Sequence, residues 1–413
     1  MMELAIFLLR KMIDKEDVDQ SRLYYVLKIY LTISGIWPYH RLRDRCVCFV
    51  SLFFLSCGIL IPQVLYLTIG VITLDDIFEC VPSIIISIVF SFKIFVIMLK
   101  SDKVKICFDA MEKNWLSLNS DVEKIILQRY TKYGQYLTTF YAVFMHTTAF
   151  LFVLKPIVLT IMSNEIFNAT KSTIPFASRL PFHVEYGHRF NQHFYPIAVH
   201  CYVAAFAHSF ATIAVDGLFY TLIQHACGMF SIIGNVLENI GKNNENDFDM
   251  KPDKIKDDNY VTALHCLRRH LLVLKFAEHI ESLFTEIFFL ILNLNMIGGS
   301  LAGMQVLMNL DKGANDIAGP VTIYVAQILH LFLQYWQAQF LLDYSILPYE
   351  SICRANWYYT SHRCRKIFLL IMSKAVTPCK ITAGKMVILS IDTFAMVVKA
   401  SVSYLTMFRS LQL

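Results

Sequence analysis

VCFVSLFFLSCGILIPQVLYLTIGVI, residues 47–72, is a mostly apolar run without a single charged side chain. A helix needs about 20 mostly apolar residues to cross the hydrocarbon core of a bilayer. This run is long enough and contains no Asp, Glu, Lys or Arg that would have to be carried into the membrane. It therefore predicts a transmembrane helix, and the rest of the chain has to be compatible with a membrane protein.

Six further stretches of the same character follow along the chain. The predicted spans are 47–72, 80–99, 136–162, 194–223, 287–310, 318–342 and 386–408. The second carries Lys93 and the seventh carries Asp392 and Lys399, so these two are the least apolar. Hydrophobic residues make up 56% of the chain and charged residues only 17%, too few to cover the surface of a soluble domain of this length. We predict an all-α membrane protein with seven transmembrane helices, forming a single domain over 1–413.

The Lys and Arg residues predict how this domain sits in the membrane. The N-terminal tail and alternate connections hold 26 of them, and the opposite connections hold four. The first set comprises 1–46, 100–135, 224–286 and 343–367, and the second 73–79, 163–193 and 311–317. The positive-inside rule then predicts a cytosolic N-terminus and an extracellular C-terminus. The one Asn-x-Ser/Thr sequon, Asn168-Ala169-Thr170, falls in an extracellular connection, so Asn168 is a predicted glycosylation site.

The long cytosolic connection 224–286 has two parts. Residues 241–260 are rich in Asn, Asp, Lys and Glu and predict a mobile loop. Residues 261–284 place leucines on one helical face, at Leu264, Leu267, Leu271 and Leu274. We therefore expect the fifth span to continue into the cytosol, where such helix extensions pack together.

A more specific signal lies in the C-terminal third. PCKITAG (378–384) precedes the last span, which contains LSIDTF (389–394) and VKASVSYLTMFR (398–409). This pattern, with Ser403-Tyr404 followed by a few apolar residues and Arg409, resembles the closing motif of insect odorant receptors. Further residues resemble family positions around the fourth, fifth and sixth spans: Asp216; Cys266, His270, Ile280, Glu281 and Phe284; Asp343, Ser345, Trp357 and Tyr358. Ala338 departs from the family, which often has Gly before the position of Gln339.

The resemblance implies a function and partners. It implies an odorant receptor subunit that binds a volatile hydrophobic ligand in the outer half of the bundle and opens a non-selective cation pore. It also implies four subunits around that pore, including the odorant receptor co-receptor, in the plasma membrane of a sensory-neuron dendrite or cilium. The 224–286 connection is much shorter than that of the co-receptor, so the chain resembles a ligand-tuned subunit. No cofactor, metal or nucleic acid is expected.

The last helix is the candidate pore lining. Ser403, Met407 and Ser410 recur at i, i+4 and i+7 and share a face. Small hydroxyls around one bulky apolar side chain suit a wet path with a hydrophobic constriction. The alternative is that Met407 faces lipid. Asp392 and Lys399 also share a face, and we expect them to pack against neighbouring helices, since charge inside a span is costly.

The candidate ligand site is an apolar pocket between the outer halves of four spans. Aromatic rings offer contact area, and Tyr or Thr hydroxyls orient a polar group of the ligand. The candidates are Ile84, Ile85 and Ile88; Phe144, Thr148 and Leu151; Tyr195, Val199, Tyr202 and Phe206; and Tyr324 and Ile328. Taken singly, each is also compatible with ordinary helix packing.

Two other features have structural interpretations. His146, His200, His208 and His225 lie in or beside the third and fourth spans, without an acidic residue at metal-ligand spacing, so we expect packing histidines. Gly299 and Gly303 form a small-xxx-small pair that favours close helix contact in the fifth span.

Other protein classes fit less well. The chain has no His-Glu-x-x-His, no Gly-x-Ser-x-Gly and no phosphate-binding glycine loop, which argues against an enzyme. A G-protein-coupled chemoreceptor has the reverse topology, and a transporter would show an internal hydropathy repeat. A gustatory-type receptor channel remains an alternative, although its closing motif differs from Ser403-Tyr404.

Overall fold

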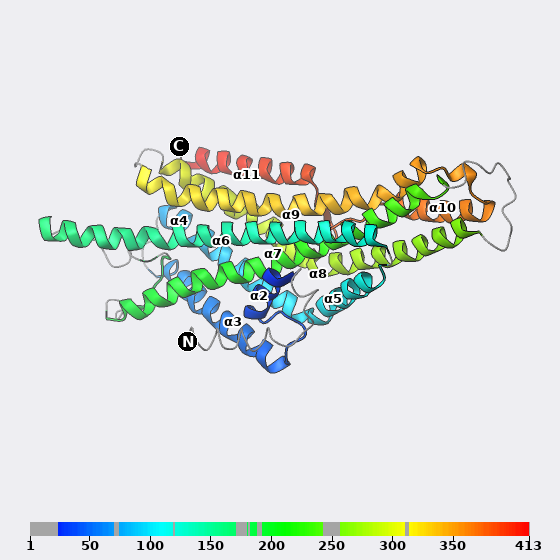
Figure 1. Ribbon diagram of the computed structural model, residues 1–413. Helices are drawn as coiled ribbons and strands as arrows, with labels where there is room; N and C mark the ends of the chain where they lie inside the picture. The colour runs from blue at the N-terminus through cyan, green and yellow to red at the C-terminus, as the bar shows by residue number, and fades with distance from the viewer. Residues whose placement is uncertain are drawn as a thin grey trace.

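The computed structural model describes residues 24–69, 74–118, 120–170, 180, 182–187, 192–242, 257–309 and 314–412. Long helices run side by side and give the molecule an elongated shape (Figure 1). The elements are α2 (Tyr25–Ile33), α3 (Leu42–Tyr66), α4 (Leu74–Leu99), α5 (Ser101–Leu116), α6 (Asp121–Thr170), α7 (Phe194–Asn239), α8 (Asp258–Met308), α9 (Ala314–Arg354), η5 (Trp357–Tyr359), α10 (His362–Ala375), β1 (Thr382–Ala383), β2 (Val387–Ile388) and α11 (Ile391–Gln412).

Each predicted span corresponds to one long helix, namely α3, α4, α6, α7, α8, α9 or α11. By length and composition alone, five helices in the described ranges can cross a membrane: α3, α4, α6, α7 and α8. The other two are long enough but carry more polar side chains, such as Gln334 and Gln337 on α9 and Lys399 on α11. The predicted helical membrane fold is therefore confirmed.

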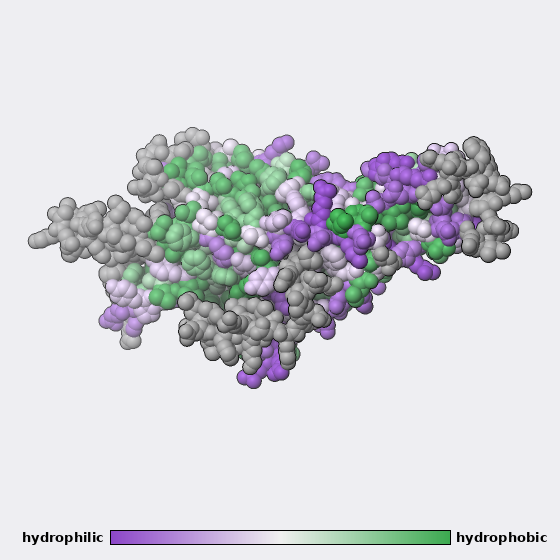
Figure 2. Space-filling view, in the orientation of Figure 1, coloured by the Kyte–Doolittle hydropathy of each residue, from purple (hydrophilic) through white to green (hydrophobic). Residues whose placement is uncertain are grey.

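Four helices are longer than a bilayer requires. α6, α7, α8 and α9 contain 50, 46, 51 and 41 residues, whereas about 20 residues span the hydrocarbon core. Hydrophobic residues cover the half of the visible surface around α6 and α11, and hydrophilic residues are concentrated toward α10 (Figure 2). There α10 packs against the extended parts of α8 and α9, as predicted for packed helix extensions.

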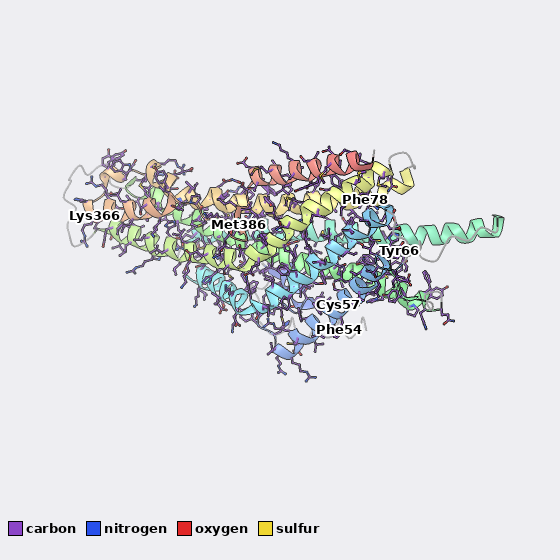
Figure 3. The ribbon with its side chains drawn as sticks, turned by 180° about the vertical axis from the view of Figure 1, so that it is seen from behind. Phe54, Cys57, Tyr66, Phe78, Lys366 and Met386 are labelled. Carbon is purple, nitrogen blue, oxygen red and sulfur yellow. The ribbon has the colours of Figure 1, made fainter. Side chains whose placement is uncertain are left out.

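The two ends of the molecule are distinct. Tyr66 at the end of α3 and Phe78 near the start of α4 lie at one end, and Lys366 of α10 lies at the other (Figure 3). α7 is the central helix and packs against α2, α3, α4, α6, α8 and α9. Its stretch 211–230 is buried almost throughout, including the large side chains of Phe219 and Tyr220.

The last helix begins later than predicted. We expected the span to start at Met386, but β1 and β2 form an antiparallel hairpin there and α11 begins at Ile391. Gly384 and Lys385 both have a φ of 60°, the left-handed conformation, and are the central residues of a β-turn in which the N–H of Met386 donates to the carbonyl of Ala383 at 3.1 Å. Ser390 then accepts a hydrogen bond from the backbone N–H of Thr393 (3.2 Å), which defines the first turn of the helix. The apolar run that starts at Met386 thus contains the short strand β2 before the helix begins, which explains why the predicted start was too early.

Candidate functional site

A cluster of polar side chains joins four helices inside the bundle. Lys93 of α4 donates to both carboxylate oxygens of Asp216 on α7, at 2.8 and 2.9 Å. The hydroxyl of Tyr141 on α6 donates to Asp216 at 2.8 Å and lies 2.5 Å from Nδ1 of His330 on α9. Gln334, one turn further along α9, donates to Asp216 at 3.2 Å. We call these five residues the polar junction.

Burial determines what the polar junction contributes. The side chains of Lys93 and Asp216 are only 1% and 4% exposed. An isolated charge at this depth would be very costly, whereas a hydrogen-bonded pair of opposite charges is tolerated. Asp216 satisfies this condition because it accepts from three different side chains. The junction therefore ties the helices to one another in one defined arrangement.

Sequence reasoning singled out Lys93 and Asp216 separately but not as partners. The signal was present, because opposite charges in two different predicted spans are natural candidates for pairing. Tyr141, His330 and Gln334 gave no comparable signal. Polar residues of these types are common in helices, and only the packing of α6 and α9 on α7 brings them to Asp216.

A second set of polar contacts lies between α3, α4 and α7. Ser83, Ser87 and Ser91 recur every four residues on α4. Gln63 of α3 donates to Ser83 at 3.1 Å, and Oγ of Ser56 on α3 lies 2.7 Å from that of Ser91. These serines therefore join α3 to α4. In the predicted orientation they lie on the extracellular side of Lys93.

The predicted ligand residues occupy the four helices that meet at the polar junction: α4, α6, α7 and α9. Eight of them are buried or half-buried in the chain: Ile84, Ile85, Phe144, Thr148, Tyr202, Phe206, Tyr324 and Ile328. The remaining four are exposed, with relative exposures of 36% for Ile88, 47% for Leu151, 61% for Val199 and 81% for Tyr195. The eight are the better candidates for an enclosed pocket.

Some of these candidates lie beside α8, as Tyr324 does next to Gly303. A Cβ atom placed on Gly298 of α8 would lie 3.4 Å from Ile85 and 3.1 Å from Gln327 of α9. Tyr202 and Phe206 instead pack against a separate apolar cluster that includes Ile59 and Cys201. The candidates therefore fall into at least two groups, one beside α8 and one beside α3.

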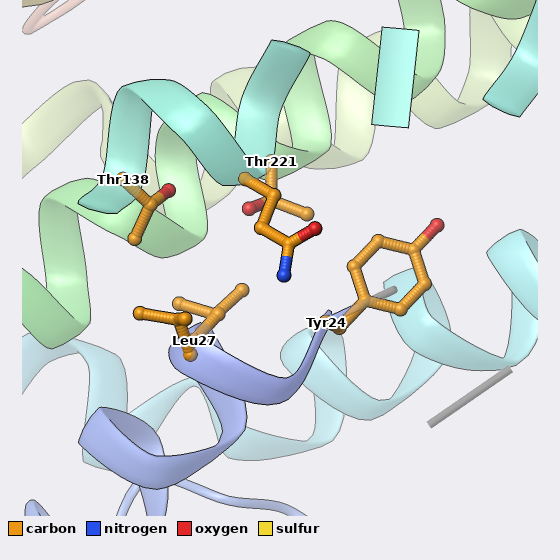
Figure 4. Close-up of a pocket in the computed structure, with 6 residues that line it drawn as sticks. Tyr24, Leu27, Thr138 and Thr221 are labelled. Atoms are coloured by element: carbon orange, nitrogen blue, oxygen red, sulfur yellow. The ribbon is translucent and has the colours of Figure 1, made fainter. Parts of the chain in front are cut away.

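A small pocket opens between α2, α6 and α7. It has an empty volume of about 190 Å³, including space open to solvent, and Tyr24, Leu27, Thr138 and Thr221 line it together with Val26 and Gln135 (Figure 4). None of the twelve predicted ligand residues belongs to it. This volume is below the roughly 300–1,000 Å³ that is typical of ligand pockets, and the pocket lies beside the N-terminal helix α2.

The predicted pore residues lie on the outside of the chain. Ser403, Met407 and Ser410 of α11 are all exposed, Met407 by 46%. Asp392 and Lys399 are exposed as well, so the expectation that they pack against neighbouring helices of the chain is wrong. By helical spacing all five fall within about 80° of one another. α11 therefore turns one face, which carries two charged residues and two serines and which we call the polar face, away from the bundle.

The opposite side of α11 rests on α8 and α9. Ser300 of α8 donates to the carbonyl of Ser401 at 3.0 Å. A Cβ atom on Gly299 would lie 3.6 Å from Ser401, and one on Gly303 would collide with Leu405. The predicted role of the glycine pair in close helix contact is thus confirmed. The helix that packs closely against the two glycines is α11.

The remaining predicted residues have these surroundings. His146 bonds to Tyr30 and to Ser209, each at 3.0 Å, and His208 lies 3.4 Å from Ser56, in agreement with packing roles. The backbone of Asn168 lies in the last turn of α6, and its side chain is outside the described residues.

The long apolar helices and the polar contacts buried between them define a multi-helix membrane protein. The sequence model of the family described as 7tm Odorant receptor matches residues 73–402, which is most of the chain. The chain therefore belongs to the 7tm Odorant receptor family, a family of receptors and not of enzymes.

Individual relatives are distant. The chain is 25% identical to odorant receptor Or2 of Anopheles gambiae over 153 residues, which are 36% of this chain and 39% of that one. It is 23% identical to odorant receptor 59b of Drosophila melanogaster over 187 residues, 45% of this chain and 46% of that one. The matched segment thus spans less than half of either curated relative.

The fold is similar to that of a solved receptor over nearly the whole chain. The structure of the insect olfactory receptor OR5 from Machilis hrabei in complex with eugenol matches with a TM-score of 0.76, 14% identity and coverage of 95% of this chain and all of that one. The structure of OR5 described without that ligand matches with a TM-score of 0.69, again at 14% identity.

Proposed function

We propose that this odorant receptor is a subunit of an odorant-gated cation channel. The subunit binds a volatile hydrophobic ligand and opens a non-selective cation pore in a heterotetramer with the odorant receptor co-receptor. It functions as a single domain over 1–413 in the plasma membrane of a sensory-neuron dendrite or cilium. Its N-terminus is cytosolic and its C-terminus is extracellular, which leaves Asn168 available for glycosylation.

The observation that carries the pore proposal is the polar face of α11. Asp392, Lys399, Ser403, Met407 and Ser410 are exposed on one side of this helix. A charged face turned toward lipid would be strongly disfavoured, so it has to meet water or another subunit. A water-filled path at the centre of an oligomer satisfies this requirement. Met407 is a bulky apolar side chain near the C-terminal end of that face and forms the constriction.

The extended ends of the helices supply the contacts between subunits. Apolar side chains are exposed there on α8 and α10, including Leu271, Leu272, Leu369 and Leu370, with exposures between 46% and 65%. Exposed apolar surface of this kind outside a bilayer is normally covered by a partner. Packing of these ends around one axis would also hold the polar faces of the α11 helices together.

The ligand binds between the outer halves of α4, α6, α7 and α9. The eight buried or half-buried candidates provide apolar area, and Tyr202, Tyr324 and Thr148 provide hydroxyls for one polar group of the ligand. All four helices continue into the polar junction, which resists independent movement of any one of them. A ligand opens the pore only by binding the open arrangement more tightly than the closed one.

Two measurements test the proposal. An epitope tag at Met1 should be accessible to antibody only after the cells are permeabilised; staining of intact cells would reverse the proposed topology.

Cells expressing the chain with a co-receptor should give inward cation currents to members of a panel of volatiles that includes eugenol. Normal surface expression without current to any member, while a known receptor responds in parallel, would count against a ligand-gated channel.

A further inference from the structure

The lipid-facing side of α3 ends in an arginine. Val47, Val50 and Phe54 are exposed by 59%, 45% and 71%, and they follow the exposed Arg43 at i+4, i+7 and i+11. The four residues therefore share one helix face. The apolar part of this face lies against hydrocarbon, so Arg43, one turn before Val47, lies at the depth of the lipid headgroups.

Aromatic and basic side chains surround this point. The loop before α3 contributes Tyr39, which is 41% exposed, and Nζ of Lys105 on α5 lies 6.0 Å from the centre of the Tyr39 ring. The Tyr39 hydroxyl donates to Asp109 of α5 at 2.6 Å, which fixes the loop on that helix. Aromatic rings with basic neighbours are typical of the membrane interface.

Three of the basic residues lie outside the ion pairs of the described structure. Arg41, Arg43 and Lys105 are exposed and, among the residues that the structure describes, make no ion pair. Lys100, at the start of the same region, is different because it already pairs with Glu286 of α8. Figure 2 shows a hydrophilic tip where α3 begins. We call Arg41, Arg43 and Lys105 the basic patch.

We propose that the basic patch binds the headgroup of an anionic phospholipid. The patch is continuous with a lipid-facing apolar surface, so acyl chains can lie along Val47 and Phe54 while the phosphate meets the guanidinium groups. A soluble partner could contact the basic residues but not the apolar surface beside them, which lies in the hydrocarbon. The proposed topology determines only which leaflet supplies the lipid. With a cytosolic N-terminus it is the cytosolic leaflet.

Binding can be measured on the purified full chain in a non-ionic detergent, with fluorescent phosphatidylserine as the probe and phosphatidylcholine for comparison. The variant Arg41→Gln/Arg43→Gln/Lys105→Gln should bind phosphatidylserine about tenfold more weakly, because each basic residue near the surface contributes to the attraction. The matched control, Arg365→Gln/Lys366→Gln/Lys374→Gln, removes three exposed basic residues of α10 at the other end of the molecule and should bind like wild type.

The inference would be overturned if the patch variant bound phosphatidylserine as tightly as wild type, or if the α10 control lost as much. Complete competition by millimolar inorganic phosphate would also overturn it, since free phosphate would then be the ligand. Thermal unfolding of both variants verifies that they are folded. The assay needs no odorant, current or co-receptor, so its outcome is independent of whether the channel proposal holds.

Discussion

Nζ of Lys93 lies 2.8 Å from Oδ1 of Asp216, although the two residues are 123 positions apart and belong to different helices. On both α4 and α7 the predicted ligand residues come earlier in the helix than the residue of this pair. In the predicted orientation the pair therefore lies on the cytosolic side of the ligand residues. Tyr141 and Gln334 add hydrogen bonds from α6 and α9 to the same carboxylate. The four helices proposed to hold the ligand therefore share one fixed point.

Removing one partner of this pair should be far worse than removing both. Asp216→Leu leaves a buried ammonium without its counter-charge and should lower the free energy of unfolding by about 3–5 kcal/mol. Lys93→Met/Asp216→Leu removes both charges and should recover much of that loss. Thermal unfolding of the purified variants, with Lys93→Met to complete the cycle, measures the coupling. Additive effects of the two substitutions would mean that the ion pair contributes no coupling.

The helices themselves were predictable from the sequence because the bilayer imposes a simple requirement. Runs such as 47–72 and 287–310 have the length and lack of charge that a span needs, and each lies on one helix. The ends were less predictable. Outside the bilayer the membrane no longer sets the length of a helix: α6 continues to Thr170, past the predicted end at 162, and a local turn at Gly384 precedes α11.

The faces of the helices could not be predicted in the same way. In a membrane protein both the interior and the lipid-facing side of a helix are apolar, so spacing alone does not tell them apart. Tyr195 and Tyr202 belong to the same predicted face of α7, yet Tyr195 is 81% exposed and Tyr202 is half-buried. Likewise, the sequence contains Tyr141 and His330 but not the packing that brings them to Asp216.

Tyr202 provides a test of the ligand site. Tyr202→Ala removes a half-buried ring beside the proposed pocket and should raise the ligand concentration for half-maximal current about tenfold, with surface expression unchanged. Tyr195→Ala is the matched control, because the same ring is removed at a position that is 81% exposed. Unchanged dose–response curves for several active ligands in the Tyr202 variant would remove the middle of α7 from the site.

One buried and one half-buried thiol outside the spans provide a test of packing at the extended helix ends. Burial raises the pKa of Cys364 to about 11 and that of Cys379 to about 12, whereas Cys353 is exposed. At neutral pH a maleimide should therefore label Cys353 much faster than Cys364 or Cys379, because the thiolate is the reacting form and access is blocked. Mass spectrometry of the labelled peptides measures this, with denatured protein as the control; equal labelling in the folded state would show that these thiols are not buried.

The same shifts predict a dependence of stability on pH. The folded-state pKa of each thiol lies above the usual cysteine pKa of 9.0, so unfolding favours deprotonation. The stabilisation by these protonated thiols is complete below about pH 9 and falls as the pH rises toward 11 or 12. Cys364→Ser/Cys379→Ser should reduce this alkaline loss of stability in thermal unfolding. An unchanged alkaline profile would assign the loss to other groups.

Met407 provides the most direct test of the pore. Met407→Ser replaces the bulky apolar side chain on the polar face of α11 with a small hydroxyl, which should allow water into the proposed constriction and raise the basal current without ligand. Val402→Ser is the control, since Val402 is similarly exposed at 45% but lies about 140° around the helix from Met407. Whole-cell basal currents of channels assembled with the co-receptor, normalised to surface expression, compare the two. If Met407→Ser leaves the basal current at the wild-type level, or Val402→Ser raises it equally, then Met407 faces lipid or a neighbouring subunit and the constriction lies elsewhere.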